Sequence, residues 1–299
     1  MNQLATPLRY PGGKARLAPY VKKLLADNKL RDSNYVEPFC GGAGLALNIL
    51  AGYVVSDIYL NDLDRSVFAF WKTVTDDNSW FCERLQEVPC TIESWLVQRE
   101  IWRAKDTADL KELGFATFFL NRTNRSGILA GGVIGGKNQN GAWKIDARFN
   151  KVDLLSRVKA IGRFSSRIHV SNLEAKIFLR TIVPSLYGSS LVYLDPPYVE
   201  KGPGLYLNSY NEEDHRSLAE VVRNELQVPW MVSYDDHPLI RECYAGASES
   251  AINLSYSAYG NGRRVKELLY LSDRLVAPTM SERRGKFAKP WHATLADEI

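Results

Sequence analysis

Short apolar runs and amphipathic stretches alternate along most of the chain, which is the pattern of strands interleaved with helices. Apolar runs that predict strands lie at residues 34–39, 53–60, 168–172, 191–194, 229–236 and 265–271. Apolar residues at helical spacing follow several of these runs, as at residues 44–50, 65–74 and 211–226. The alternation predicts an α/β fold built on a mostly parallel central sheet.

The segment from residue 76 to 120 differs, because it predicts several successive helices. Its aromatic residues, Trp80 and Trp95 among them, fall at helical spacings that favour a packed core. Residues 129–148 are rich in glycine and contain Asn140-Gly141, a strong turn signal, so they predict a mobile hairpin. We therefore expect one domain formed by residues 1–75 and 173–275, a mostly helical insertion at 76–172, and a loose tail at 276–299.

The strand predicted at residues 191–194 ends abruptly in Asp195, Pro196, Pro197 and Tyr198. Because proline has no N–H to donate to a sheet ladder, the strand must stop there. Asp195 and Tyr198 are thereby delivered to the carboxyl end of the strand, which is the edge at which open parallel sheets bind ligands. A strand that merely runs into a proline turn is the ordinary alternative.

A carboxylate held beside a backbone carbonyl suits transfer to an amine that is conjugated with a heteroaromatic ring. Such an amine is a poor nucleophile because its lone pair is delocalised. If Asp195 and the carbonyl of Pro196 accept its two N–H hydrogen bonds, the nitrogen moves towards tetrahedral geometry and its lone pair can attack an electrophile. The ring of Tyr198 offers a face on which an extruded base can stack.

Two glycine-rich turns near the amino terminus add a candidate ligand site. The turn at residues 10–14, Tyr-Pro-Gly-Gly-Lys, precedes an amphipathic helix, and its glycine pair lets the backbone approach a ligand closely. The turn at residues 37–44 joins a predicted strand to a predicted helix, where glycines can admit an adenosyl group. Asp62, about twenty residues further on, is placed to accept hydrogen bonds from ribose hydroxyls, whereas Asp64 is predicted to cap the following helix.

The composition indicates a globular protein and argues against a membrane protein or an exported one. A chain of 299 residues with 45% hydrophobic content can bury a substantial core. We expect neither membrane insertion nor export, because no apolar run is long enough to span a bilayer and the amino terminus lacks a signal peptide's apolar core. The four cysteines show no metal-ligand spacing, so we expect reduced thiols in a cytoplasm and no bound metal.

The net charge of +4 is mild, but its distribution is uneven. Residues 99–180 carry 16 Lys and Arg against 7 Asp and Glu, a net of +9, while the rest of the chain carries a net of −5. A basic internal segment in an otherwise acidic chain is expected of an enzyme that presents one face to a polyanion. A solvated helical surface that happens to be basic is the alternative.

The quartet at 195–198, with Pro-Gly-Gly-Lys at 11–14 and Glu-Pro-Phe-Cys-Gly-Gly-Ala-Gly at 37–44, resembles the Dam-like class of adenine-specific DNA methyltransferases. The resemblance runs from about residue 8 to 272 and implies the Rossmann-like sheet of methyltransferases that use S-adenosyl-L-methionine (AdoMet). It also implies an inserted, mostly helical DNA-recognition region. The reaction implied is methyl transfer to the 6-amino group of an adenine flipped out of double-stranded DNA by a monomer, without a metal.

Site residues follow from the same resemblance. Those implied to be catalytic are Asp195, Pro196, Pro197 and Tyr198. Those implied to hold AdoMet are Tyr10, Lys14, Glu37, Pro38, Phe39, Gly41, Asp62 and Asp195. Ala43 stands where the class usually has its second glycine, so the later glycines of that turn carry less weight than Phe39 and Gly41.

The basic segment and the residues before the last strand supply the candidate contacts to DNA. Lysines mostly hold phosphates, whereas Asn and Gln read adenine in the major groove. The candidate contacts are Arg122, Asn124, Arg125, Lys137, Asn138, Gln139, Lys144, Arg263 and Arg264. A surface hairpin without function is the alternative, and the target sequence is not predicted.

Three other functions are compatible with the same motifs. Methylation of the exocyclic amine of cytosine, or of a base in RNA, would use the same four residues. Methylation of a protein glutamine usually goes with Asn at the first position of the quartet. A DNA-binding module that has lost catalysis is disfavoured because Lys14, Asp62 and Asp195 are all in place.

Overall fold

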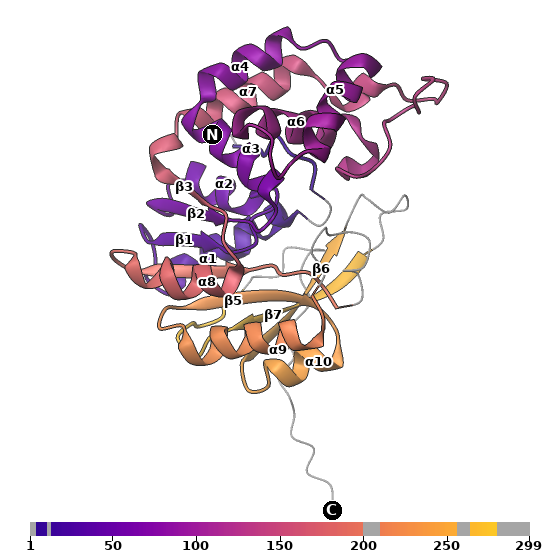
Figure 1. Ribbon diagram of the computed structural model, residues 1–299. Helices are drawn as coiled ribbons and strands as arrows, with labels where there is room; N and C mark the ends of the chain where they lie inside the picture. Colours follow the sequence, from indigo (N-terminus) through magenta and orange to yellow (C-terminus); the bar gives the residue numbers. More distant parts are fainter. Residues whose placement is uncertain (1–3, 11–12, 200–209, 256–263, 280–299) are drawn as a thin grey trace, which may run out of the picture.

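A computed structural model describes residues 4–10, 13–199, 210–255 and 264–279, and these residues form one seven-stranded sheet flanked by helices (Figure 1). Its strands are β1 (Asn34–Glu37), β2 (Asp57–Asn61), β3 (Ile168–Ser171), β4 (Ser190–Leu194), β5 (Trp230–Asp235), β6 (Ser248–Ser255) and β7 (Arg264–Leu271). The order across the sheet is β3-β2-β1-β4-β5-β7-β6. The first five strands pair in parallel, and β7 runs antiparallel to both β5 and β6. The predicted α/β class is confirmed.

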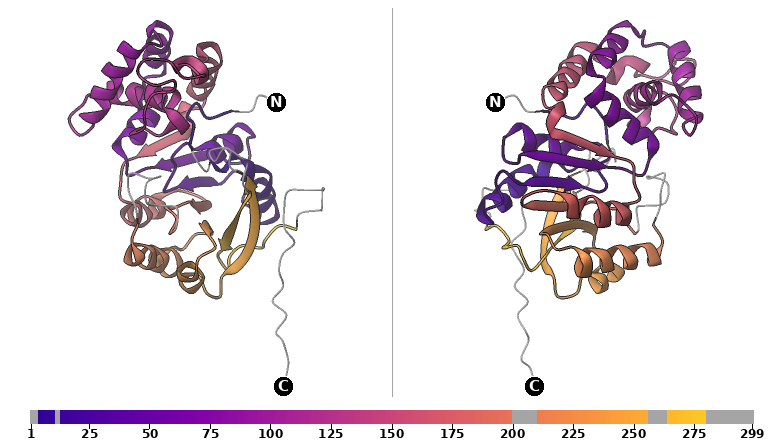
Figure 2. Two further views of the ribbon diagram at one scale, coloured as in Figure 1. Left: turned by 90° about the vertical axis from the view of Figure 1, so that its right-hand side faces the viewer. Right: turned by 60° about the vertical axis from the view of Figure 1, so that its left-hand side comes forward.

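Helices cover both faces of the sheet (Figures 1 and 2). The flanking helices are α1 (Ala18–Asp27), α2 (Gly44–Ala51), α8 (Ala175–Thr181), α9 (Glu212–Glu220) and α10 (Pro238–Cys243). Successive residues of one strand enter different cores: Tyr35 packs with α1 and α2, whereas Val36 packs with α8, α9 and α10. Parallel strands that are buried on both faces need apolar residues at every position. The arrangement of one sheet between two layers of helices therefore explains the unbroken apolar runs of the sequence.

A helical layer stands above one end of the sheet and is formed by the chain between β2 and β3 (Figure 1). Its helices are α3 (Arg65–Asp76), α4 (Asn78–Glu87), α5 (Ile92–Arg103), α6 (Leu110–Thr123) and α7 (Lys151–Gly162). Phe70 of α3 stacks on Phe118 of α6 at 6.2 Å between centroids, and Phe81 of α4 lies edge-on to both rings. The aromatic residues of the predicted helical segment therefore form a core.

The predicted starts of two helices are confirmed, and one predicted strand starts later than expected. The carboxylate of Asp64 accepts a hydrogen bond from the Ser66 N–H at 2.9 Å and caps α3, as predicted. Asn211 forms a capping box with Asp214 at the start of α9, which continues as one π-helical turn over Val221–Glu225. The predicted second strand begins later than residue 53, because the turns after α2 extend to residue 56.

The prediction of a hairpin at residues 129–148 is wrong. The described chain there consists of turns and a short 3-10 helix (Ile145–Arg148), with a single antiparallel bridge between Asn124 and Val133. Hydrogen bonds from the side chain of Gln139 hold this segment together in place of strand pairing. Its Nε2 donates to the carbonyls of Ile134 (2.8 Å) and Gly136 (2.6 Å), and its Oε1 accepts from the Ile145 N–H (2.8 Å). One amide thus satisfies backbone groups that strand pairing would otherwise satisfy.

Most of the predicted tail, residues 280–299, lies outside the described residues. Arg263 also lies outside them, and Arg264 begins β7. Within the described part of the chain, every helix is too short or too polar to cross a lipid bilayer.

Candidate functional site

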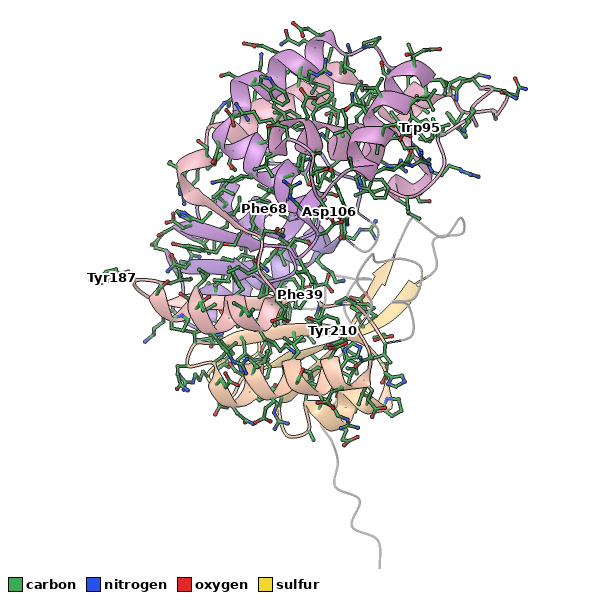
Figure 3. All side chains as sticks on the ribbon, in the orientation of Figure 1. Phe39, Phe68, Trp95, Asp106, Tyr187 and Tyr210 are labelled. Atoms are coloured by element: carbon green, nitrogen blue, oxygen red, sulfur yellow. The ribbon has the colours of Figure 1, made fainter. Side chains whose placement is uncertain are left out.

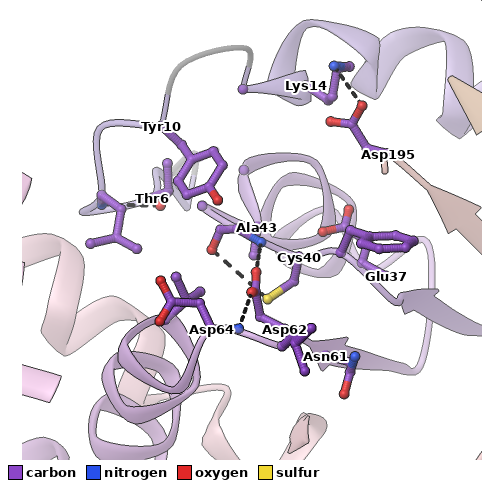
Figure 4. Close-up of a pocket in the computed structure, with 18 of the residues that line it drawn as sticks. Thr6, Tyr10, Lys14, Glu37, Cys40, Ala43, Asn61, Asp62, Asp64 and Asp195 are labelled. Atoms are coloured by element: carbon purple, nitrogen blue, oxygen red, sulfur yellow. Dashed lines mark hydrogen bonds and ion pairs between the residues drawn. The ribbon is translucent and has the colours of Figure 1, made fainter. Parts of the chain in front are cut away.

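The strand order of the sheet reverses between β1 and β4, and such a switch point opens a crevice at the carboxyl ends of the strands. A cavity of about 320 Å³ lies there. Its walls include Glu37 at the end of β1, Asp62 after β2 and Asp195 after β4, together with Tyr10 from the amino-terminal segment (Figure 4). Phe39, two residues beyond Glu37, also lines the cavity. The structure therefore brings together residues that are far apart in the sequence.

The turn between β1 and α2 is shaped to carry the ring of Tyr10. Gly41 has φ of +43°, and a Cβ at this position would lie 2.6 Å from the Tyr10 ring. A Cβ at Gly42 would lie 2.8 Å from the Tyr10 Cβ. The carbonyl of Gly41 accepts a hydrogen bond from the Trp71 indole at 2.8 Å, which ties the turn to α3. Glycine is thus required at these two positions by the close approach of Tyr10.

Asp62 is bound to the same turn. Its Oδ2 accepts from the Gly41 N–H at 2.9 Å, and its Oδ1 accepts from the Asp64 N–H at 3.0 Å (Figure 4). Burial raises the pKa of Asp62 to about 7, against the lowering effect of these two N–H groups. A ligand that donates hydrogen bonds to this carboxylate would favour its ionised form.

Glu37 is a second buried acid on the cavity wall. Burial foremost, and then the negative charge of Asp195, raises the pKa of Glu37 to about 8. Among the described residues, its Oε1 has no hydrogen-bond partner. A buried oxygen of this kind is suited to a ligand group that carries N–H donors.

Lys14 links three elements at the far end of the cavity. Its Nζ lies 2.9 Å from Asp195 Oδ1 and 3.5 Å from Glu267 Oε2, and it donates to the Tyr198 hydroxyl at 2.7 Å. Burial alone would lower the pKa of Lys14, but the carboxylates of Asp195 and Glu267 outweigh burial and raise it. The ammonium is therefore charged at neutral pH and holds the two carboxylates together.

Asp195 is held through one oxygen. Besides the contact with Lys14, its Oδ1 accepts from the Ser233 hydroxyl at 2.9 Å and from the Tyr198 hydroxyl at 3.2 Å. Its Oδ2 has no partner among the described residues, and the side chain keeps 21% of its surface exposed. The fixed Oδ1 orients the carboxylate, which leaves Oδ2 available to a ligand.

The other members of the quartet lie deeper than expected. Pro196 and Pro197 are buried, and Pro197 lines the cavity. Tyr198 is only 5% exposed. The Lys14 ammonium lies 5.0 Å from the centroid of its ring, and the centroid of the Tyr234 ring lies 6.1 Å from the same point. In this arrangement Tyr198 positions Lys14 and Asp195, and its ring would have to be uncovered before a base could stack on it.

Three site residues were missed by the sequence reasoning, namely Glu267, Ser233 and Tyr210. Glu267 is a fully buried acid on β7, and its signal is a carboxylate within an otherwise apolar strand. Tyr210 lines the cavity and meets Phe39 edge-on at 5.9 Å between centroids (Figure 3). No local motif marks Ser233, because its role depends on β5 lying beside β4.

The candidate DNA contacts fall into two groups. Arg125, Lys137, Asn138 and Lys144 are exposed. Asn124, in contrast, is fully buried: its amide donates to the carbonyls of Ile128 and Leu129, both at 2.9 Å, and accepts from the Trp95 indole at 2.7 Å. The expectation that Asn124 and Gln139 face DNA therefore needs correction, since both amides are used to shape the loop.

Arg122 is half-buried beside other arginines. Its Nε donates to the Arg148 carbonyl at 2.8 Å. Burial first, and then repulsion from Arg9 and Arg157, lowers the pKa of Arg122 to about 10, so it stays charged at neutral pH.

The described residues include no group of three or more His, Cys, Asp or Glu side chains that could hold a metal ion.

A model of the family described as D12 class N6 adenine-specific DNA methyltransferase matches residues 10–257. DNA adenine methylase of Escherichia coli strain K12 is 24% identical to this chain over 277 residues, which cover 88% of this chain and 94% of the relative. Type II methyltransferase M.MjaIII of Methanocaldococcus jannaschii is 22% identical over 235 residues, which cover 72% of this chain and 78% of the relative. Among solved structures, the rRNA methyltransferase aviRa from Streptomyces viridochromogenes is 16% identical with a TM-score of 0.35 and covers 91% of this chain and 92% of that chain.

Proposed function

The chain belongs to the D12 class N6 adenine-specific DNA methyltransferases, and from this we propose that it methylates the 6-amino group of adenine in double-stranded DNA with AdoMet as methyl donor. The observation that carries the proposal is Asp195. Its Oδ1 is fixed by Lys14, Ser233 and Tyr198, and its carboxylate lies on the wall of the cavity that Asp62 and Glu37 also line.

The residues of the cavity fit AdoMet at both of its ends. Asp62 is a buried carboxylate next to a glycine turn, which suits ribose hydroxyls. Glu37 presents an unsatisfied buried oxygen, which suits the ammonium of the methionine part. We assign Tyr10, Phe39, Gly41 and Pro38 to the walls of this site, with Lys14 beside Asp195. When bound, AdoMet supplies an electrophilic methyl group on a sulfonium sulfur.

The acceptor chemistry follows from the orientation of Asp195. The amine of the adenine donates one hydrogen bond to Oδ2 of Asp195 and one to the carbonyl of Pro196, and these two bonds direct the nitrogen lone pair into the cavity. AdoMet bound in the cavity would supply the methyl group to this nitrogen and would leave as the neutral thioether S-adenosylhomocysteine. The methylated nitrogen then loses one proton to water or to Asp195. Because the target atom is inside a duplex, the adenine has to be flipped out of the stack to reach Asp195.

The proposal is tested by incubating the protein with AdoMet and duplex DNA, then analysing the nucleosides by mass spectrometry. We expect N6-methyladenine. Methylcytosine as the sole product, or methylation of RNA or polypeptide in place of DNA, would overturn the assignment. Mapping the modified bases in random-sequence DNA gives the target site in the same experiment.

Binding of AdoMet should release protons near neutral pH. The pKa of Asp62 is about 7 and that of Glu37 is about 8 in the protein alone. Hydrogen bonds from ribose hydroxyls and an ammonium favour the ionised carboxylates, so binding lowers both pKa values and the affinity rises as pH increases from 6 to 8. Calorimetry in two buffers of different ionisation enthalpy measures the protons released. Asp62→Asn should release fewer, and proton uptake at pH 6.5 would contradict the assignment.

Affinity for DNA should fall steeply with salt. Arg125, Lys137 and Lys144 are exposed on the basic insertion, and three phosphate contacts correspond to a slope of about −2.7 in log K against log salt. Lys137→Ala should reduce that slope by about 0.9. Arg31→Ala, which removes an exposed charge outside the insertion, is the matched control and should leave the slope unchanged. A flat response between low and physiological salt would remove the insertion from the DNA interface.

A further inference from the structure

Trp143 is a large apolar side chain held in water. It is 70% exposed, whereas Trp71, Trp95 and Trp230 are buried. It lies in the segment between α6 and α7 that projects beyond the helices at the upper right of Figure 1. Tryptophan combines a large apolar ring with one N–H donor, so an exposed indole that projects from the molecule offers a face on which a partner can stack.

The loop that carries Trp143 is held in shape before any partner binds. Besides the three hydrogen bonds of the Gln139 amide, the Lys144 ammonium donates to the Gln139 carbonyl at 2.6 Å, and the Gly141 N–H donates to the Gly135 carbonyl at 3.1 Å. Gly135 has φ of +83°, and a Cβ there would lie 2.6 Å from the Trp143 carbonyl. The backbone around Trp143 is therefore constrained, which lowers the entropy lost when the ring engages a partner.

The charges beside Trp143 indicate which partner fits. Lys137 and Lys144 are exposed on the same loop, and residues 99–180 carry the basic excess of the chain. Ammonium groups pair with phosphates, and an indole face stacks on any nucleobase. A loop that presents one exposed aromatic ring and two exposed lysines is thus complementary to a nucleic acid, because it offers a stacking face together with positive charge.

We propose that Trp143 packs its indole ring against a nucleobase of the bound DNA while Lys137 and Lys144 pair with neighbouring phosphates. The inference rests on the proposed function, because it takes DNA as the substrate. Apolar side chains that enter a duplex insert between two neighbouring base pairs and partly unstack them, and stacking of the ring on a base offsets the free energy of unstacking. The role differs from that of the cavity, since Trp143 is not among the residues that line it.

The test compares three variants for binding to a labelled duplex by fluorescence anisotropy. Trp143→Ala should weaken binding about tenfold, and Trp143→Phe should restore most of the loss, because phenylalanine also stacks. Tyr187→Ala is the matched control: Tyr187 is fully exposed and lies on the side of the molecule away from Trp95 of the helical layer (Figure 3), so its removal should change nothing. The salt slope of Trp143→Ala should equal that of the parent protein, because an indole neutralises no phosphate.

A spectroscopic measurement separates stacking from a structural role. DNA should quench the fluorescence of the exposed indole in the parent protein, and this quenching should be lost in Trp143→Phe. Unchanged DNA affinity of Trp143→Ala, or equal weakness of the Ala and Phe variants, would overturn the inference. Either outcome leaves the proposed function intact if the parent protein still produces N6-methyladenine, whereas absence of that product would count against the function itself.

Discussion

Asp195→Ala should abolish methyl transfer while leaving AdoMet binding measurable. The carboxylate is the group that orients the adenine amine, and loss of such orientation is expected to slow the chemical step on the order of a thousandfold. Asp195 is not needed to form the ribose end of the cavity, which depends on Asp62 and Gly41. Single-turnover transfer of a labelled methyl group measures the rate, and calorimetry measures AdoMet binding in parallel.

Two further variants separate orientation from simple loss of charge. Asp195→Asn keeps an oxygen for Lys14 and Ser233 but presents N–H donors where the adenine amine also donates, so it should be nearly as slow as Asp195→Ala. Ser233→Ala removes one hydroxyl, 2.9 Å from Oδ1, and should lower the rate much less because Lys14 and Tyr198 still hold that oxygen. Turnover at the parent rate by Asp195→Ala would eliminate the proposed role of this carboxylate.

The sheet and one half of the site follow from local sequence patterns. An apolar run that ends in Asp195 and two prolines predicts β4 and its exit without any knowledge of the other strands. Gly41 and Asp62 were likewise predictable, because the strand–turn–helix pattern and the spacing to the next strand place both at one edge of the sheet. The structure joins them by a hydrogen bond of 2.9 Å.

The other half depends on contacts that no local pattern encodes. Glu267 reaches Lys14 only because β7 lies antiparallel beside β5 and β5 lies beside β4. The amides of Asn124 and Gln139 bind loop carbonyls, although the same side chains in a basic, glycine-rich segment are equally typical of base recognition. Whether a polar side chain satisfies its own loop or a ligand is decided by tertiary geometry, so the predicted hairpin and two predicted DNA contacts failed for one reason.

The buried charge cluster of Lys14, Asp195 and Glu267 should contribute strongly to the stability of the fold. Lys14 is the cation shared by Asp195 and Glu267, and the side chains of Lys14 and Glu267 are 5% and 0% exposed. Replacement by a neutral residue of similar length, Lys14→Met, leaves two carboxylates close together in a poorly solvated place. Removal of one partner of a buried ion pair is expected to lower the free energy of unfolding by about 3–5 kcal/mol.

The same physics predicts a partial rescue, which distinguishes lost charge compensation from poor packing of the methionine. In Lys14→Met/Glu267→Gln one of the two repelling carboxylates is neutral, so the double variant should be more stable than Lys14→Met alone, although neither should methylate DNA at the parent rate. Lys14→Met should also recover stability as pH falls, because protonation of a carboxylate relieves the repulsion. Urea denaturation at pH 5 and pH 7 measures both effects. If the two substitutions simply add, the three groups do not act as one electrostatic unit, and Lys14 has to be regarded as a packing residue of the cavity wall.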